Sequence, residues 1–470
     1  MKTFNLILFL LFIGVIFSCK KSNTTDTNNI PPLPEGNDCG DHVLKEPYIV
    51  FAGDPTGMAL IIQTTYYVHE MGTVKIKWSY DLNTLDHCSY CVMDSYNCKV
   101  NGGDQDYYIW RKSWPHGEFN PNSKVYYRVN VHLPNHDYYF DGFFYTSDDN
   151  MTALTFYAFG DTRDAGTEYA SVMNSMATDM DVDWEQRGRL IIHTGDIVFN
   201  GPWHTYYPSD QTWNTYFFGR GCYNNGGNRD KALWILARVP VLTTLGNHDF
   251  MWDGHGDKDN ARFYMTNWPY WMYTYTNKIT LDQLCNDQDY IPDESSIHYS
   301  FDYGPAHFIS LDTYSYTGID QTVGLSPGYP QVEWLENDLK NNNKPWTFVF
   351  CHIPFYDGGG AYNHTAISGC EPLFQKYGVD AVLQGHQHCY VRYNADKGTS
   401  NEIPYITLGC GGVAPEPNAH EFAECYAEKY HFARFDITNT DSIQVFITEK
   451  FLNQPGNIEK FYIKNRPKQR

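Results

Sequence analysis

Basic side chains and long apolar runs are both scarce in this sequence. Its 470 residues contain 34 Lys and Arg against 55 Asp and Glu, which gives a formal net charge of −21. A field of that sign repels nucleic acid phosphates and anionic lipid surfaces, so we expect no nucleic acid partner. It also repels small phosphorylated molecules unless a local positive centre reverses the sign. Beyond residues 6–17, no segment approaches the ~20 apolar residues that a membrane-spanning helix needs.

The N-terminal segment has the pattern of an export signal. Lys2 precedes the apolar run and Cys19 follows it, and the run is too short to span a membrane. We predict a signal peptide over residues 1–18. Residues 16–19 resemble a bacterial lipobox, which makes residues 19–45 a lipidated Cys19 and a flexible tether. The prediction is an exported lipoprotein, periplasmic or at the cell surface and anchored only through this lipid; cleavage without lipidation would give a secreted protein.

The cysteines fit an exported chain. There are 12 of them, and export permits disulfides. Cys88, Cys91 and Cys98 lie close together, and we predict one or two disulfides there rather than a zinc site, because a fourth ligand at suitable spacing is missing. Cys351 ends an apolar strand-like run and is predicted to be a buried free thiol.

The chain is long enough for two or three domains, and its patterning divides it in two. In residues 46–149 apolar and polar residues alternate, as in the segment Val74–Tyr80 and again in Val125–Leu133. Several short strands without helical periodicity predict an N-terminal β-sandwich.

After residue 150 strand-like runs alternate with helical stretches, which predicts an α/β domain over residues 150–470. Val172, Met176 and Met180 have helical spacing. Helices are also predicted over residues 230–238 and 331–340.

Five polar motifs in this second region each follow a strand-like run. Ligand sites of α/β sheets lie at the carboxyl ends of strands, so these motifs can converge on one cleft. A glycine begins four of them and permits a sharp turn close to an ion. The motifs are Gly160-Asp161-Thr162-Arg163, Gly195-Asp196, Gly246-Asn247-His248-Asp249, His352 and Gly385-His386-Gln387-His388.

The motifs supply two carboxylates, one carboxamide and three imidazoles as ligands, without thiolates. Such a set suits Zn, Mn, Fe or Co, and six ligands are enough for two ions that share a bridging carboxylate. Two ions can generate hydroxide and stabilise both oxygens of an in-line displacement at phosphorus. They also supply the local positive charge that an acidic protein needs to hold a phosphate.

The ordered motifs resemble the calcineurin-like metallophosphoesterase superfamily. The sequence is more narrowly similar to the purple acid phosphatase branch, whose members carry a fibronectin type III-like sandwich before the catalytic domain. Residues 300–304, 307–313 and 331–335 also look like that branch, and the likeness runs from about Pro47 to the C-terminus. The resemblance implies an α/β/β/α four-layer catalytic domain with two divalent or mixed-valence ions of Fe, Zn or Mn.

The resemblance also implies a role for each residue. Asp161 and His388 would hold the first metal ion, and Asp196 would bridge the two ions. His248 would either contact the substrate phosphate or protonate the leaving-group oxygen, and Asp249 would orient the His248 ring. His364 is a second candidate for contact with the substrate, although it equally fits a loop residue on the surface. The ligands implied for the second ion are Asn247, His352 and His386.

Two positions depart from the family pattern. Many metallophosphoesterases have Asp-x-His at the first motif, where this sequence has Arg163. The purple enzymes place a Tyr three residues after the bridging Asp, where this sequence has Phe199. The first ion is left with three protein ligands and no tyrosinate. Arg163 cannot ligate a metal; it could pair with a phosphate oxygen or bond to neighbouring carbonyls or Asp164.

The sequence therefore favours an exported hydrolase of small phosphate esters, an acid phosphatase-like phosphomonoesterase. A phosphodiesterase acting through the same ligands is an alternative. So is a non-catalytic surface module with a degenerate site, although the complete ligand set speaks against it. Metal-dependent hydrolysis of a non-phosphate ester would use similar ions.

Overall fold

The structure is a computed structural model. No helix within the part of the chain that it describes is long and apolar enough to cross a membrane. The predicted signal peptide and Cys19 lie outside the described residues, as does Phe199. The structure describes residues 42–51, 57–98, 107–114, 117–163, 167–198, 217–218, 229–249, 264, 267–268, 298–313, 323–438, 441–449 and 456–468.

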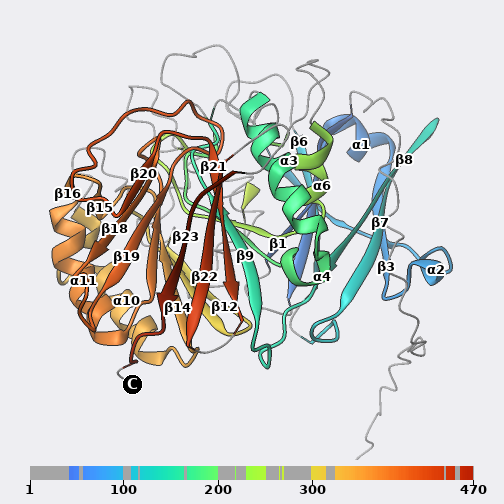
Figure 1. Cartoon of the computed structure of the whole chain (residues 1–470). Helices are drawn as coiled ribbons and strands as arrows, with labels where there is room; N and C mark the ends of the chain where they lie inside the picture. The colour runs from blue at the N-terminus through green and yellow to red at the C-terminus, as the bar shows by residue number, and fades with distance from the viewer. Residues whose placement is uncertain are drawn as a thin grey trace, which may run out of the picture. The chain divides into compact units, whose positions relative to one another are not determined.

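Two antiparallel four-stranded sheets form the N-terminal part and confirm the predicted β-sandwich (Figure 1). Their strand orders are β1-β2-β6-β5 and β4-β3-β7-β8. Trp114 of one sheet packs against Trp78 and Phe144 of the other, with ring centroids 5.6 and 5.8 Å apart. The elements are β1 (Val43–Phe51), β2 (Met58–Thr65), α1 (Tyr66–Met71), β3 (Thr73–Ser79), α2 (Leu82–Leu85), β4 (Cys91–Val92), β5 (Asp94–Cys98), β6 (Tyr107–Trp114), β7 (Lys124–Leu133) and β8 (His136–Tyr145).

Alternation predicted the buried face of β7 better than that of β3. Every second residue of β7 from Val125 to Leu133 is buried. In β3 the pattern breaks after Ile76, because Lys77 is buried while Trp78 is partly exposed. The Lys77 ammonium lies over the Tyr90 ring and 3.4 Å from an Asp86 oxygen, and these contacts compensate its burial.

The expected disulfide near Cys88 is wrong. Cys88 and Cys91 are free thiols. Cys88 follows α2 and its thiol donates to the Thr84 carbonyl oxygen within that helix, whereas Cys91 lies in β4. The side chain of Cys98 lies outside the described residues. Cys351 is a buried free thiol, as predicted.

Two further sheets face each other in the second part and confirm the α/β fold (Figure 1). In one, β9, β10 and β11 are parallel; in the other, β13, β14, β17 and β19 are parallel. Phe156 of β9 meets Phe308 and Phe348 of the opposite sheet at 5.1 and 5.0 Å between centroids. The sheets are β11 (Val241–Thr243)-β10 (Ile191–His193)-β9 (Leu154–Phe159)-β21 (His431–Ile437)-β22 (Ser442–Glu449)-β23 (Gly456–Lys464) and β12 (Tyr299–Tyr303)-β13 (Ala306–Ser310)-β14 (Trp346–Phe350)-β17 (Ala381–Gln384)-β19 (Ile403–Leu408)-β18 (Tyr390–Ala395)-β20 (Cys425–Ala427).

Helices cover the outer faces of both sheets and complete the four layers. The residues with helical spacing, Val172, Met176 and Met180, are fully buried in α3. Leu335 and Phe374, from two helices on the other side, join one apolar cluster with Val349 of β14. The remaining elements are α3 (Thr167–Asp181), α4 (Trp184–Arg187), α6 (Arg229–Leu236), η4 (Val323–Leu325), α10 (Pro330–Asn341), α11 (His364–Tyr377) and the short strands β15 (Tyr356–Asp357) and β16 (Gly360–Ala361).

Candidate metal centre

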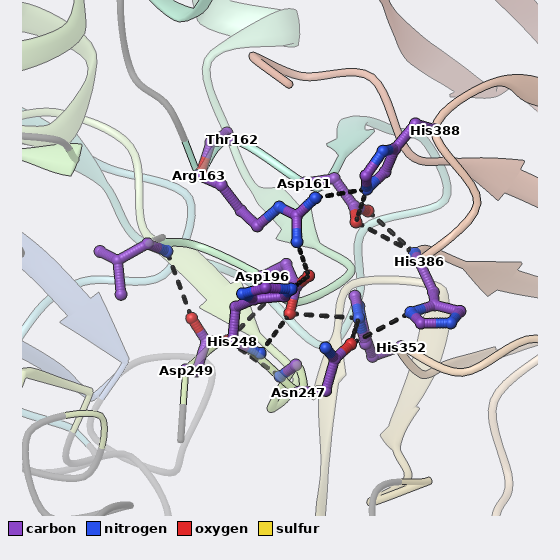
Figure 2. Close-up of polar contacts among 12 residues, drawn as sticks. Asp161, Thr162, Arg163, Asp196, Asn247, His248, Asp249, His352, His386 and His388 are labelled. Carbon is purple, nitrogen blue, oxygen red and sulfur yellow. Dashed lines mark hydrogen bonds and ion pairs between the residues drawn. The ribbon is translucent and has the colours of Figure 1, made fainter. Parts of the chain in front are cut away.

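The five motifs meet at the carboxyl ends of strands from both sheets. They follow β9, β10 and β11 of one sheet and β14 and β17 of the other. Figure 2 shows the side chains of these loops turned toward one another around Asp196. Parallel strands place their carboxyl ends at one edge of a sheet, so two facing sheets can build one site from distant segments.

Strained backbone holds three of these residues in place. Asp161, Asp196 and His386 have φ values of 54°, 53° and 69°, in the left-handed region that side chains other than glycine rarely adopt. Gly195, before Asp196, has a φ of 90°. A side chain on Gly246 would clash with the Asp196 amide nitrogen, so glycine is required where these loops approach.

Backbone hydrogen bonds join the loops to each other. The Asp161 amide donates to the Gly195 carbonyl oxygen over 3.0 Å, and the Thr162 amide donates to that of Asp196 over 3.0 Å. The His386 amide donates to the Asp161 carboxylate over 3.0 and 3.2 Å. The Asp161 carboxylate is thus held by the main chain of a different loop.

One group of donor atoms lies on the Oδ1 side of Asp196. This oxygen is 3.2 Å from His352 Nε2, which is 2.9 Å from Asn247 Oδ1. His386 Nδ1 is 3.0 Å from the same Asn247 oxygen. The His352 Nδ1 donates to the Thr194 carbonyl oxygen over 2.9 Å, which leaves Nε2 directed at the site.

Different side chains lie near the Oδ2 atom of Asp196. Arg163 Nη1 is 3.5 Å from this oxygen, and Arg163 Nη2 donates to His388 Nε2 over 2.8 Å. His388 Nε2 is 3.8 Å from Asp161 Oδ1. The ring of His248 is partly exposed, with Nε2 4.0 Å from Asp196 Oδ2. The Arg163 guanidinium therefore lies among the donor atoms on this side.

Burial and neighbouring charges shift the acidity of these groups in opposite directions. Burial raises the pKa of Asp161 well above its usual value. Burial also opposes ionisation of Asp196, but the charge and hydrogen bond of His352, together with the charges of His248 and Arg163, outweigh it and hold the pKa of Asp196 well below its usual value. Burial lowers the pKa of His352, yet Asp196 and Asp161 raise it to about 9. Burial lowers the pKa of His248 to about 4.

Comparisons with known proteins identify the family of this chain. Residues 154–390, just over half of the chain, match the calcineurin-like phosphoesterase family. This chain belongs to that family. Human (Homo sapiens) acid phosphatase type 7 is 30% identical over 252 residues, which cover 45% of this chain and 50% of the relative. A purple acid phosphatase of Glycine max is 32% identical over 177 residues, 31% of this chain and 35% of the relative. The chain thus spans about half of these relatives or less.

A solved structure supports the fold across both parts of the chain. A purple acid phosphatase from yellow lupin (Lupinus luteus) seeds superposes on this chain with a TM-score of 0.63. The superposition covers 89% of this chain and 74% of the lupin chain. Its sequence identity is 16%, so the likeness concerns the fold. It extends beyond the segment that matches the calcineurin-like phosphoesterase family.

The residues present fit the two metal ions that calcineurin-like phosphoesterases use. Single ligand atoms of Asp161, Asp196 and His352, all buried, lie within 4.8 Å of one another. Asp196 Oδ2 is a buried oxygen that accepts no hydrogen bond within the described residues. A buried carboxylate oxygen without a hydrogen bond needs a cation nearby, and in this structure the Arg163 guanidinium, with Nη1 3.5 Å away, is the cation at that oxygen. Nitrogen and oxygen donors without thiolates suit Fe, Zn or Mn.

Two of the predicted site residues, Asp249 and His364, do not make the contacts that we expected of them. In place of a contact with the His248 ring, the Asp249 carboxylate accepts from the backbone amides of Gly246, Asp196 and Ile197, over 2.8, 3.1 and 2.8 Å. It therefore holds the loop of Asp196. His364 begins α11 and is exposed, and the structure describes no contact between its side chain and the donor atoms.

Two contacts had no signal in the sequence. The carbonyl of Thr194 orients His352, and any residue type can supply a carbonyl. Glu416 lies in a loop without periodicity, with its carboxylate 3.5 Å from His388 Nδ1 and its amide bonded to the His388 carbonyl oxygen. Only the path of that loop through space brings it to the site.

Proposed function

We propose that this chain hydrolyses phosphate monoesters with two metal ions bound on the two sides of Asp196. The observation that carries the proposal is the placement of separate donor groups at the two oxygens of one buried carboxylate. Asn247, His352 and His386 would hold one ion, and Asp161 and His388 the other, with Asp196 between them. When bound, the ions supply Lewis acidity that activates water and neutralises charge on the phosphate.

Two of the remaining polar side chains, His248 and Arg163, act on the substrate. His248 is partly exposed beside Asp196 Oδ2, so its ring can donate to a phosphate oxygen or to the leaving-group oxygen. The guanidinium of Arg163 can pair with an oxygen of the phosphate. Asp249 positions the Asp196 loop through backbone amides. His364 would contact the substrate only if the substrate extends beyond the donor atoms.

The test is hydrolysis of an aryl phosphate monoester and an aryl phosphate diester, measured together with the metal content of the purified chain. We expect about two ions per chain, faster cleavage of the monoester, and loss of activity in Asp196→Asn. Faster cleavage of the diester would make the chain a phosphodiesterase. Protein that stays inactive after addition of Zn, Mn or Fe would favour a non-catalytic surface module. Activity on a carboxylic ester that inorganic phosphate does not inhibit would favour a non-phosphate hydrolase.

We further propose that the chain is exported and anchored by a lipid on Cys19. The domains would be a signal peptide over 1–18, the lipidated tether over 19–45, a fibronectin type III-like sandwich over 46–149 and the catalytic domain over 150–470. Support comes from the short apolar run between Lys2 and Cys19. Labelling with a fatty acid should mark the wild-type chain and not Cys19→Ala. Equal labelling of both would refute the anchor.

A further inference from the structure

Arg163 lies where an ion on the Oδ2 side of Asp196 would need to bind. The atoms available to such an ion are Asp196 Oδ2, His388 Nε2 and an Asp161 oxygen. The guanidinium reaches two of them: Nη1 is 3.5 Å from Asp196 Oδ2, and Nη2 is 2.8 Å from His388 Nε2 (Figure 2). Because Arg163 is 9% exposed, this arrangement is built into the site.

The contact between Arg163 and His388 uses the atom through which His388 would bind a metal ion. A guanidinium can only donate, so His388 Nε2 accepts the hydrogen bond with its single lone pair. A metal ion would use that same lone pair. A guanidinium, unlike an imidazole, does not vacate such a position by releasing a proton to the ion. It must turn away.

The opposite side of Asp196 contains no guanidinium in the contacts described. There the ring nitrogens of His352 and His386 donate to Asn247 Oδ1, and an imidazole, unlike a guanidinium, can release such a proton to a metal ion. Donor atoms about 2.1 Å from a common ion lie about 3 Å apart. The spacings on the Oδ1 side are 2.9 Å from His352 Nε2 to Asn247 Oδ1, 3.0 Å from there to His386 Nδ1, and 3.2 Å from His352 Nε2 to Asp196 Oδ1. These three spacings match those of neighbouring ligands around one ion.

We propose that Arg163 competes with one of the two metal ions. The ion on the Oδ1 side binds first and tightly, and the ion on the Oδ2 side binds only after the guanidinium leaves His388 and Asp196. The inference rests on the proposed metal site and assigns different affinities to its two positions. The Arg163 amide is bonded to the Asp196 carbonyl oxygen over 3.3 Å, so the displacement that we propose concerns the side chain and not the backbone. The displaced guanidinium then becomes available to an anionic phosphate.

The experiment is a calorimetric titration of the chelator-treated full chain with Zn²⁺, supported by the spin-resonance spectrum of bound Mn²⁺. Wild type should bind one equivalent tightly and a second at least about tenfold more weakly. Arg163→Gln, which is neutral, should strengthen the weak step about tenfold. Arg163→His supplies an imidazole and should give two tight equivalents. Arg163→Lys keeps the charge and serves as the matched control, with a smaller gain.

Two ligand variants identify which step belongs to which side. His388→Gln should remove the weak step and leave the tight one, whereas Asn247→Ala should weaken the tight one. The Mn²⁺ spectrum should show a single ion at one equivalent and coupled ions only at high concentration. Thermal unfolding of each variant verifies that it is folded.

Two equal tight steps in wild type that Arg163→Gln leaves unchanged would overturn the proposal. No Zn²⁺ binding at all would overturn it together with the metal site. Because the readout is binding, failure of the chain to hydrolyse phosphate esters is a separate result: it would refute the proposed function while the two steps still test Arg163.

Discussion

Among the residues that the structure describes, two buried histidines lie against carboxylates, and one of the two belongs to the candidate site. His352 is next to Asp196, and His307 bridges Asp302 and Asp338 over 2.7 and 2.8 Å. Burial lowers the pKa of both rings, but the carboxylates raise each to about 9. A raised histidine pKa therefore does not by itself distinguish a reactive centre from a structural contact.

The surroundings of His307 and His352 differ in the contacts of the carboxylate oxygens that do not face the ring. Near His307, Ser300 Oγ donates to Asp338 Oδ1 over 2.6 Å, and Asp302 is 41% exposed to water. Near His352, Asp196 Oδ2 is buried without a hydrogen bond within the described residues. Surplus donor atoms mark a site that can take a cation, whereas satisfied carboxylates mark a contact that stabilises the fold.

The largest expected effect is on activity in Asp196→Asn. This change keeps the side-chain shape but removes the charge between the two donor groups, so hydrolysis of an aryl phosphate should fall by at least about a thousandfold. Steady-state kinetics measures it, with His307→Gln as the control that should remain near wild type. Retained activity in Asp196→Asn would place the chemistry elsewhere.

The next effect is on metal binding in His352→Gln. Loss of the Nε2 donor should weaken the tighter Zn²⁺ equivalent by more than about 100-fold, because even residues that only orient metal ligands contribute 10 to 100-fold. Calorimetry measures the affinity, and His307→Gln should titrate like wild type. If both histidine variants lost Zn²⁺ equally, the proposed distinction between them would be wrong.

A smaller effect, on stability, belongs to His307. His307→Gln removes the cation between Asp302 and Asp338, and we expect the free energy of unfolding at neutral pH to fall by about 2 kcal/mol. Denaturant unfolding measures it. An unchanged midpoint would mean that water satisfies these carboxylates as well as the ring does.

The smallest effect is the pH dependence of that difference. The folded pKa of His307, about 9, lies above its unfolded value of 6.5, so its contribution is complete below the unfolded pKa and disappears as the pH rises through the folded one. The stability gap between wild type and His307→Gln should thus be widest near pH 6 and closed near pH 10. A gap that widens with pH would contradict the protonated bridge.

Much of the site was predictable because its parts are local in the sequence. A strand, a glycine and a polar residue form a short pattern, and the topology of α/β sheets brings strand ends together. The four-layer arrangement likewise agrees with the resemblance that these motifs carry. Contacts that depend on a loop's path were not predictable, as with Glu416 beside His388. The same holds for Lys77, whose burial depends on contacts with Asp86 and Tyr90.

The sequence by itself determined which donor types exist, their order along the chain and the absence of an imidazole where Arg163 stands. The tertiary structure alone decided that the Arg163 guanidinium contacts His388 and Asp196 and that the Asp249 carboxylate binds backbone amides. The physical reason is the separation in sequence of the residues involved. Where a strand ends depends on residues a few positions away. Which oxygen meets which cation is set by loops that join two facing sheets.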